Sequence, residues 1–335
     1  MYTETYQGIN SFLKGACKLL LTEGVNRKTR GYSCYELPEP FMFKLTNPLS
    51  RIVTIPERKW NKTLPYAESL WIASGRNDLA YICHYLDRMS DFSDDGVYMR
   101  GGYGPRLRDY NGLTTDYQIG TINARKEEAI DQLRYIVECF SKDPETRRAV
   151  ISFGDPMKDN FDDNGILKES KDIPCTREIH FIKQTTNNKL DLIVKMRSND
   201  LIWGASAVNI FNYTFMQEYM AAILGMEVGN YYHLADNMHY YEDFKEMVKT
   251  IANTQDVEDN ATAHHKSFHS LNDFDVLITK LGHEEELMRK DFSSYRRIEM
   301  EDDFFQNWYN VLYLYNYQKQ KNNAFQISTY LFGRH

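Results

Sequence analysis

The sequence predicts an α/β fold, because helical and extended patterns alternate along its 335 residues without a low-complexity linker or an internal repeat. The middle third is the most regular part. Residues 178–183 and 189–196 are short extended runs joined by a polar Thr-Thr-Asn-Asn segment, which is typical of a β-hairpin. A long apolar helix is predicted from about Val208 to Leu224, because Gly225 follows it where a helix end favours glycine.

The other elements are predicted from the spacing of apolar residues. Helices are expected over residues 5–23, 64–86, 123–139, 284–296 and 302–317, with one more starting at Tyr241. Extended segments are expected over residues 35–54, 149–153 and 228–234, which are rich in Phe, Pro or β-branched side chains. Because no composition shift marks a boundary, we expect a single domain over residues 1–335.

Composition and charge exclude several classes of protein. A hydrophobic share of 42%, with 14% aromatic residues, indicates a packed core rather than a disordered chain. The formal net charge of −7 gives no basic footprint for duplex nucleic acid, so an anionic ligand must be met by local arginines. No window approaches the roughly 18 apolar residues of a membrane span, and the N-terminus lacks a signal-peptide pattern. We therefore expect a cytoplasmic protein without a membrane partner.

The cysteines and acidic segments carry less information. Five cysteines form no CxxC pair, and their odd number and wide spacing argue against a disulfide framework or a zinc site. We therefore expect free thiols and no metal. The acidic segments 155–163 and 256–260 are expected to be solvated.

One cysteine has the surroundings of a nucleophile. Cys175 follows Pro174, which fixes the local backbone, and lies two residues before Arg177, which could lower the thiol pKa. A lone cysteine is more often a small buried hydrophobe, so these neighbours alone do not decide its role.

An ordered series of motifs follows this cysteine. It consists of Pro174-Cys175, Arg197-Ser198-Asn199-Asp200, Gly204, Asn209-Ile210 and Asp236-Asn237-Met238-His239-Tyr240-Tyr241. In order and spacing the series resembles the thymidylate synthase family, including its pyrimidine-nucleotide hydroxymethylase branch. Upstream, the resemblance extends to Glu68 on a helix, the turn Tyr103-Gly104-Pro105-Arg106, the pair Arg147-Arg148, and a phosphate arginine that is either Arg27 or Arg30. It covers about residues 5–250, which leaves 251–335 as a divergent C-terminal extension.

The resemblance implies a fold and an activity. The fold would be a twisted mixed sheet with surrounding helices, in a homodimer whose active sites are shared through Arg147 and Arg148. The reaction would be one-carbon transfer from 5,10-methylenetetrahydrofolate to C5 of a pyrimidine nucleoside monophosphate. A thiolate that adds at C6 makes C5 nucleophilic, which explains the need for a cysteine. Nucleotide biosynthesis is the implied role.

The resemblance also implies a role for each site residue. The catalytic residues would be Cys175, Glu68, Asn209 and Tyr103, with Asn209 also holding the base. The remaining substrate contacts would come from Arg27 or Arg30, Arg147, Arg148, Arg197, Ser198, His239 and Tyr241. Asp200, Trp203 and Gly204 would bind the folate.

Each of these residues has a structural alternative. Arg147 and Arg148 could be an exposed turn, His239 a core histidine, Asp200 a helix N-cap and Glu68 a solvated helix residue. A cysteine hydrolase that uses Cys175 with His239, and a non-catalytic nucleotide-binding homologue, are alternative functions. The cluster of arginines argues against the first, and the presence of Cys175 and Glu68 argues against the second.

Departures from the family pattern bear on the product. Thr176 stands where the family usually has His, Lys195-Met196 where it has Tyr-Gln, and the spacing from Gly204 to Asn209 is one residue longer. The segment 89–92 lacks a shielding Trp, although Trp203, Tyr330 or Phe332 could replace it. The missing Trp, the change at Thr176 and the lack of a recognisable closing segment in the C-terminal extension would each admit water, so we favour a hydroxymethyl product over a methyl one. We favour uracil over cytosine, because the amide of Asn209 suits the O4 and N3–H edge.

Overall fold

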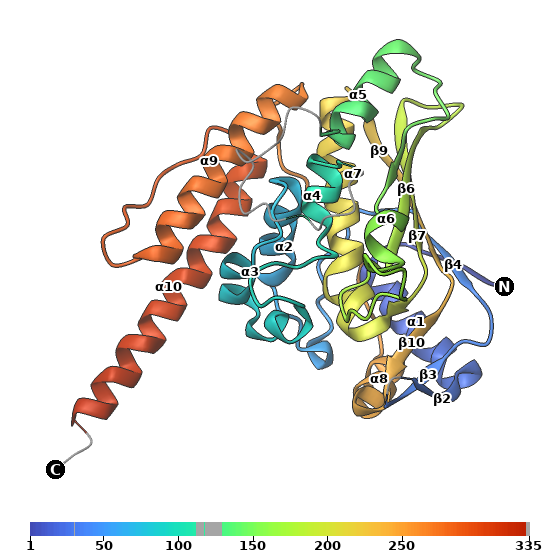
Figure 1. Cartoon of the computed structure of the whole chain (residues 1–335), viewed down its shortest axis with the longest axis horizontal. Coiled ribbons are helices and arrows are strands. Elements are labelled where there is room, and N and C mark those ends of the chain that lie inside the picture. The colour runs from blue at the N-terminus through green and yellow to red at the C-terminus, as the bar shows by residue number, and fades with distance from the viewer. Residues whose placement is uncertain (30, 112–116, 118–128, 333–335) are drawn as a thin grey trace. The chain divides into compact units, whose positions relative to one another are not determined.

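The computed structural model describes residues 1–29, 31–111, 117 and 129–332, with side chains described as far as residue 322. The chain forms two compact units, Met1–Ala263 and His264–His335 (Figure 1). All of the motifs named above lie in the first unit. The single domain over residues 1–335 stays a prediction.

A six-stranded mixed sheet is the centre of the first unit. Its strands lie in the order β1-β4-β9-β7-β6-β5, where β1 is Tyr2–Tyr6, β4 Phe41–Leu45, β9 Glu227–Ala235, β7 Lys189–Met196, β6 Thr176–Lys183 and β5 Val150–Ser152. The β1/β4 and β7/β9 pairs are parallel and the others antiparallel. This mixed sheet confirms the predicted fold class, and the β6–β7 pair confirms the predicted hairpin.

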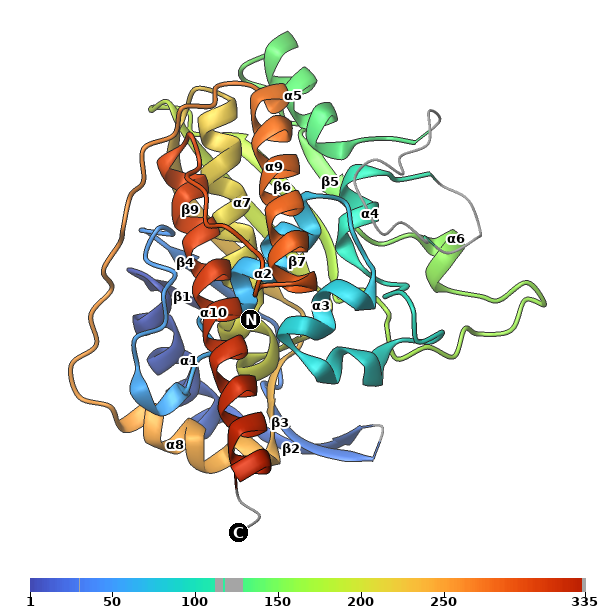
Figure 2. The same cartoon turned by 90° about the vertical axis from the view of Figure 1, so that its left-hand side faces the viewer.

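The first unit also contains a second, four-stranded sheet. Its order is β2-β3-β10-β8, where β2 is Val25–Thr29, β3 Tyr32–Glu36, β10 Met238–Tyr241 and β8 Asn199–Asp200 (Figure 2). Two segments connect the sheets, because β8 follows β7 and β10 follows β9 almost directly. The residues after Met196 and after Ala235 therefore come together at the junction of the two sheets, where Asn199 N donates to Asn237 O at 2.8 Å.

The helices of the first unit pack on the large sheet or on one another (Figure 1). They are α1 Ile9–Glu23, α2 Leu64–Ala73, α3 Leu79–Tyr85, α4 Tyr103–Arg108, α5 Gln132–Lys142, α6 Pro156–Asp159, α7 Ile210–Ile223 and α8 Lys245–Asn253. Helix α7 is almost entirely buried, and the Gln217 Nε2 donates to carbonyls of Leu190 and Asn230 on adjacent strands. This apolar helix is fixed on β7 and β9, so its first turn has a defined position at the sheet end.

Some predicted helices have different bounds. The helix expected over 64–86 is two helices, because Gly75 has a φ of 77°, which ends α2. The one expected over 123–139 is α5, where the Asp131 carboxylate caps Gln132–Lys142; residues 123–128 lie outside the described part. The N-terminal segment begins with strand β1 before α1, and the helix expected at Tyr241 begins only at Lys245, after the short 3₁₀ turn Glu242–Phe244.

The second unit contains two long helices, α9 Leu271–Lys290 and α10 Asp303–Phe332, which lie side by side. Aromatic contacts form its core, because Phe268 packs edge-on against Phe274 and Phe305, and Phe305 stacks on Trp308. Asp302 accepts from the N–H groups of Ser267 and Phe305. Of the helices in the described ranges, none is long and apolar enough to cross a membrane.

Candidate active site

The residues before Cys175 are held by one arginine. Cys175 is half-buried and directly precedes β6, and Arg197 directly follows β7, its antiparallel neighbour. The Arg197 guanidinium donates to the carbonyls of Ile173 and Pro174 at 2.9 and 3.1 Å, and its backbone N–H donates to the Cys175 carbonyl at 2.9 Å. This arginine therefore fixes the backbone of the cysteine loop.

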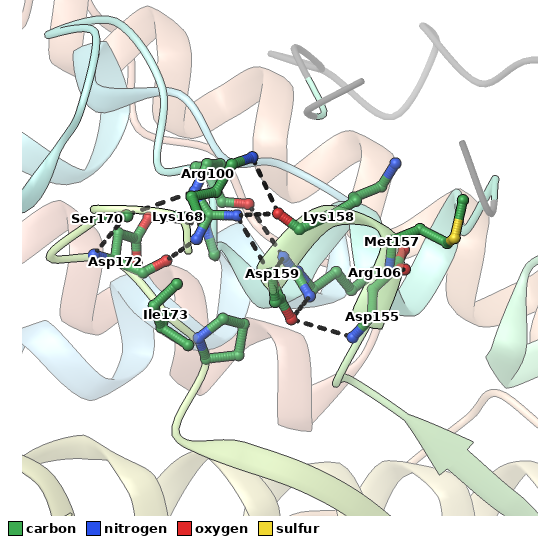
Figure 3. A network of polar contacts seen from close by, with 12 residues as sticks. Arg100, Arg106, Asp155, Met157, Lys158, Asp159, Lys168, Ser170, Asp172 and Ile173 are labelled. Atoms are coloured by element: carbon green, nitrogen blue, oxygen red, sulfur yellow. Dashed lines mark hydrogen bonds and ion pairs between the residues drawn. The ribbon is translucent and has the colours of Figure 1, made fainter. Parts of the chain in front are cut away.

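A buried network fixes the chain further upstream (Figure 3). The Arg106 guanidinium binds both carboxylate oxygens of Asp159 at 2.7 and 3.0 Å. Arg100 donates to the Asp172 carbonyl at 2.9 Å, and the Gly101 N–H donates to the Asp172 carboxylate at 2.7 Å. Burial raises the pKa of Asp172 to about 6. The network connects the turn that carries Tyr103 to the loop that carries Cys175.

The expectation that segment 155–163 is solvated is wrong for its first half. Asp155 and Asp159 are buried, with 0% and 5% of their surface exposed. For Asp159 the reason is the pair Arg100 and Arg106, which supplies buried positive charge from a distant part of the chain.

Three hydroxyl groups meet beside Cys175. The Thr176 N–H and hydroxyl both donate to the Tyr103 oxygen at 3.2 Å, and the Tyr213 hydroxyl contacts the Thr176 hydroxyl. Since Thr176 gives its hydrogen to Tyr103, Tyr103 keeps its own hydrogen for another acceptor. Burial, with Cys175 as the next cause, raises the pKa of Tyr103 to about 12. Sequence reasoning missed Tyr213, whose position four residues after Asn209 on the same helix face was the available signal.

Glu68 lies close to this cluster. It is on α2, and burial raises the pKa of its carboxyl to about 7, although a hydrogen bond from Asn212 acts in the opposite direction. The Asn212 side chain is oriented by Ser69, whose hydroxyl donates to its Oδ1 at 2.8 Å. Glu68 also contributes to the raised pKa values of Tyr103 and Tyr213. It is therefore not the solvated helix residue of the structural alternative, and Asn212 is a contact that the motifs did not reveal.

Asn209 ends a π-helix. Residues Leu201–Asn209 form this helix, and the Ile210 N–H donates to the Ala205 carbonyl, five residues earlier. A π-helical turn contains about one residue more than an α-helical turn. It therefore accommodates the additional residue between Gly204 and Asn209. The Asn209 Nδ2 donates to the Asn199 Oδ1 at 3.1 Å. Asn209 is half-buried beside Gly204.

Asp200 caps the same π-helix. Its Oδ1 accepts from the N–H groups of Ile202 and Trp203, and burial raises the pKa of its carboxyl to about 6. The structural alternative for Asp200 is thus present in the fold. Its other oxygen, Oδ2, is buried, has no hydrogen bond within the described residues and lies 3.9 Å from the His239 Nε2. Trp203 is 44% exposed and carries the Arg88 guanidinium over its ring at 4.9 Å.

The second sheet aligns Arg27 with Tyr241. Both residues are opposite Cys34 in the strand register, so the two side chains lie on one face. The exposed Arg27 donates to Glu36 at 2.5 Å, and Glu36 also accepts from Asn237, whose Oδ1 contacts the His239 Nδ1 at 2.8 Å. Ser198 is half-buried next to Arg197. Arg30 lies outside the described residues.

Arg147 and Arg148 do not join the cluster. They are exposed between α5 and β5. The Phe181 N–H donates to the Ala149 carbonyl, so the pair lies near the far end of β6. Six residues of β6 separate this point from Cys175, which is about 20 Å at roughly 3.3 Å per residue. Within one chain, the two arginines are therefore remote from the cysteine.

The fold and the cluster together define the class of protein. It is a mixed α/β protein in which a half-buried cysteine, an arginine-fixed loop, a buried carboxyl of raised pKa and an asparagine meet where two sheets join. The chain belongs to the thymidylate synthase family, whose model matches residues 13–329. The match extends beyond the region of about 5–250 in which the motifs carry the resemblance.

Curated relatives fall into two groups. A deoxyuridylate hydroxymethyltransferase of Bacillus phage SP01 is 36% identical over 243 residues, 72% of this chain and 60% of the relative. One of Pseudomonas phage M6 is 32% identical over 246 residues, 73% of this chain and 63% of the relative. A thymidylate synthase of Symbiobacterium thermophilum is 30% identical over 190 residues, 55% of this chain and 60% of the relative. The chain thus spans about three fifths of the length of these relatives.

Proposed function

We propose that this protein transfers a one-carbon unit from 5,10-methylenetetrahydrofolate to C5 of deoxyuridylate and releases the 5-hydroxymethyl nucleotide. The observation that carries the proposal is the cluster of Cys175, Arg197, Glu68 and Asn209 around one sheet junction. Family membership and the two hydroxymethyltransferases of higher identity support it. The choice of the deoxy sugar rests on the names of those relatives.

Cys175 is the proposed nucleophile. Its thiolate forms a bond to C6 of the pyrimidine, and the electron pair of the C5–C6 double bond moves toward the O4 carbonyl, so that C5 can attack the one-carbon unit. Arg197 beside the loop favours the thiolate over the thiol. Expulsion of the thiolate at the end restores the double bond.

Glu68, Tyr103 and Asn209 are proposed to handle protons and the base. The pKa of about 7 lets the Glu68 carboxyl take and return a proton near neutral pH, while Tyr103 stays protonated and donates a hydrogen bond. Asn209 offers an amide to the edge of the pyrimidine. These groups lie on α2, α4 and the π-helix, so the packing of three elements fixes their separation.

The phosphate is proposed to bind arginines from two chains. We assign Arg197, Ser198 and Arg27 to the phosphate and His239 and Tyr241 to the sugar. This is supported by the strand pairing, which brings Arg27, His239 and Tyr241 into one sheet with β8. Arg147 and Arg148 are about 20 Å from Cys175 along β6, so they can serve a phosphate only in the site of a second copy. This separation supports the proposed homodimer with shared sites, and Arg30 stays a prediction for the same phosphate.

The folate is proposed to bind beside the π-helix. The buried Asp200 Oδ2, which lacks a hydrogen bond in the described structure, is next to the exposed ring of Trp203. An acceptor beside an aromatic face suits a flat heterocycle with N–H donors, so these residues fit the group. Gly204, in the same π-helix, stays a predicted folate contact. When bound, methylenetetrahydrofolate supplies a carbon at the oxidation level of formaldehyde.

Water is proposed to complete the reaction. Once C5 has lost its proton and the bond from the transferred carbon to the tetrahydrofolate nitrogen has broken, C5 carries an exocyclic methylene. Addition of water there gives the hydroxymethyl group without oxidation or reduction. The 3₁₀ turn Asp87–Phe92 has no buried side chain and no Trp, which is consistent with access for water. Thymidylate synthase activity is the second candidate, favoured by the Symbiobacterium relative and by Trp203, which could shield the methylene.

One assay separates these functions. The purified full chain is incubated with deoxyuridylate and methylenetetrahydrofolate, and both products are analysed by mass spectrometry. Tetrahydrofolate with a nucleotide one oxygen heavier than thymidylate supports hydroxymethylation. Dihydrofolate formed in step with thymidylate shows that hydride moved and makes the protein a thymidylate synthase. Binding of the nucleotide without any product identifies a non-catalytic homologue.

A further inference from the structure

A row of buried polar groups leads from the core to Asn209. The Tyr231 hydroxyl contacts the His233 Nδ1 at 2.8 Å, the His233 Nε2 contacts the Asn199 Nδ2 at 2.9 Å, and the Asn199 Oδ1 accepts from Asn209 Nδ2 at 3.1 Å. Tyr231, His233 and Asn199 are at most 2% exposed. Asn209, the last member, is half-buried and is the one placed to meet a ligand.

The chemistry of these groups fixes the direction of each bond. An amide nitrogen can only donate, so the His233 Nε2 that faces it must carry a lone pair. The proton of the neutral ring is then on Nδ1 and is donated to the Tyr231 oxygen. Burial lowers the pKa of His233 to about 3, so the ring stays neutral at physiological pH. The position of one proton on His233 therefore determines the donor-to-acceptor direction of every hydrogen bond in the row, which we call its polarity.

Gly204 leaves room for the last bond. A Cβ at this position would lie 2.6 Å from the Asn199 Oδ1 and 2.9 Å from the Asn209 Nδ2, closer than real Cβ atoms come. Any side chain at residue 204 would therefore push these two amides apart. Within the described residues, the Asn209 Nδ2 also contacts the thioether of Met196 at 3.7 Å, which is a weak acceptor.

We infer that Asn199 and His233 are positioning residues, which hold the Asn209 amide in the orientation that recognises uracil rather than cytosine. This inference rests on the proposed function, in which Asn209 meets the base. In the observed polarity Asn209 offers Oδ1 to the N3–H of uracil and its second N–H to O4. Cytosine presents the reverse pattern, an acceptor at N3 and a donor at C4. Reversing the row would require the His233 proton to be on Nε2.

The test compares three variants of the full chain. Asn199→Leu keeps the volume but removes both hydrogen bonds, so the Asn209 amide can turn over. Asn199→Asp keeps an acceptor for the Asn209 Nδ2. Asn10→Leu is the matched control, because Asn10 is also buried, with 1% exposed, and bonds to carbonyls of Ile52 and Glu258 outside the site.

The dissociation constants of deoxyuridylate and deoxycytidylate are measured by calorimetry, together with that of deoxyribose 5-phosphate, which has no base. We expect Asn199→Leu to lower the preference for uracil about tenfold, while the binding of deoxyribose 5-phosphate changes less than twofold. Asn199→Asp and Asn10→Leu should keep the wild-type preference. An Asn199→Leu protein with unchanged preference would overturn the inference.

A second measurement does not depend on the variants. In the wild-type protein with ¹⁵N-labelled histidine, the ring nitrogens of His233 should report a proton on Nδ1 and none on Nε2. The opposite tautomer would overturn the inference even if no variant folds. Failure of the proposed function has a different result, namely that the wild type binds neither nucleotide or yields no product in the turnover assay.

Discussion

The two halves of the candidate site differ in how they are held. The half that would meet the pyrimidine, called the buried half below, is cross-bonded: Asn209, Tyr103 and the loop before Cys175, which Arg197 holds, all have protein partners at defined distances. The half that would meet the phosphate is exposed, with Arg27, Arg147 and Arg148 on the surface. We infer from this difference that one chain by itself holds the groups that would act on the pyrimidine in fixed positions, whereas part of the phosphate site would come from a second chain.

The largest effect is expected when the nucleophile of the buried half is removed. Cys175→Ala should lower kcat by more than about 10³-fold, because no other thiol lies at the start of β6. Nucleotide affinity should change less than threefold, since the phosphate and sugar contacts come from other residues. Turnover assays and calorimetry measure the two quantities. Cys83→Ala is the matched control, because Cys83 is also a half-buried free thiol. Retained turnover in Cys175→Ala would remove the nucleophile from the proposal.

The second prediction breaks the exposed half. Arg148→Glu should lower kcat/KM about 100-fold, because it opposes a dianionic phosphate with a negative charge. Its thermal stability should hardly change, because the side chain is exposed. Arg134→Glu, an exposed arginine on neighbouring α5, is the control for charge reversal alone.

Mixing Arg148→Glu with Cys175→Ala tests whether the halves come from different chains. Random exchange of equal amounts gives half heterodimers, each with one intact site, so about a quarter of wild-type activity should return. A mixture that stays inactive despite confirmed subunit exchange would mean that each chain forms its own site.

Sequence motifs identified the residues of the buried half but not what holds them. Cys175, Arg197 and Asn209 were found because they follow one another in a known order. Asn212, Asn199 and His233 were missed, because a hydrogen bond between distant segments leaves no periodic pattern in the sequence. Tyr213 was missed although its spacing from Asn209 was a usable signal. The buried Asp159 was assigned to a solvated segment for the same reason, since its partner Arg106 is 53 residues away.

For the fold too, some elements were predicted from the sequence and others were not. The hairpin and the long apolar helix follow from local pattern, whereas the mixed sheet follows from the family resemblance. Strand β1 is short and polar, and only its pairing with β4 defines it. The break after α2 depends on Gly75, where a turn with positive φ replaces a continuous helix.

The third prediction concerns the folding stability that is lost when the Glu68 carboxyl ionises in the folded protein. Glu68 has a pKa of about 7 in the folded protein, above its ordinary value of 4.5, because burial disfavours the charged form. The folded state therefore binds the proton more tightly than the unfolded chain. The stabilisation from protonation is complete below about pH 4.5 and is lost as the pH rises through 7.

Glu68→Gln should consequently be more stable than the wild type at pH 8, by about 3 kcal/mol in the free energy of unfolding, and equally stable near pH 4. Its activity should fall, because an amide cannot carry the proton. Urea unfolding at both pH values measures the difference, with the exposed Glu57→Gln as control. A stability difference that does not depend on pH would contradict the raised pKa.

The smallest expected effect is a change in which base the buried half prefers. Asn209→Asp should shift the preference from uracil toward cytosine by about tenfold, because a protonated carboxyl offers both a donor and an acceptor to the N3 and amino edge of cytosine. The Asn199 amide would then have to turn its Nδ2 toward residue 209, and the His233 proton would move to Nε2. Competition between deoxyuridylate and deoxycytidylate for binding measures the shift. A wild-type protein that binds only cytidine nucleotides would reverse the expected order, and an Asn209→Asp protein that still prefers uracil would show that the base is read by another group.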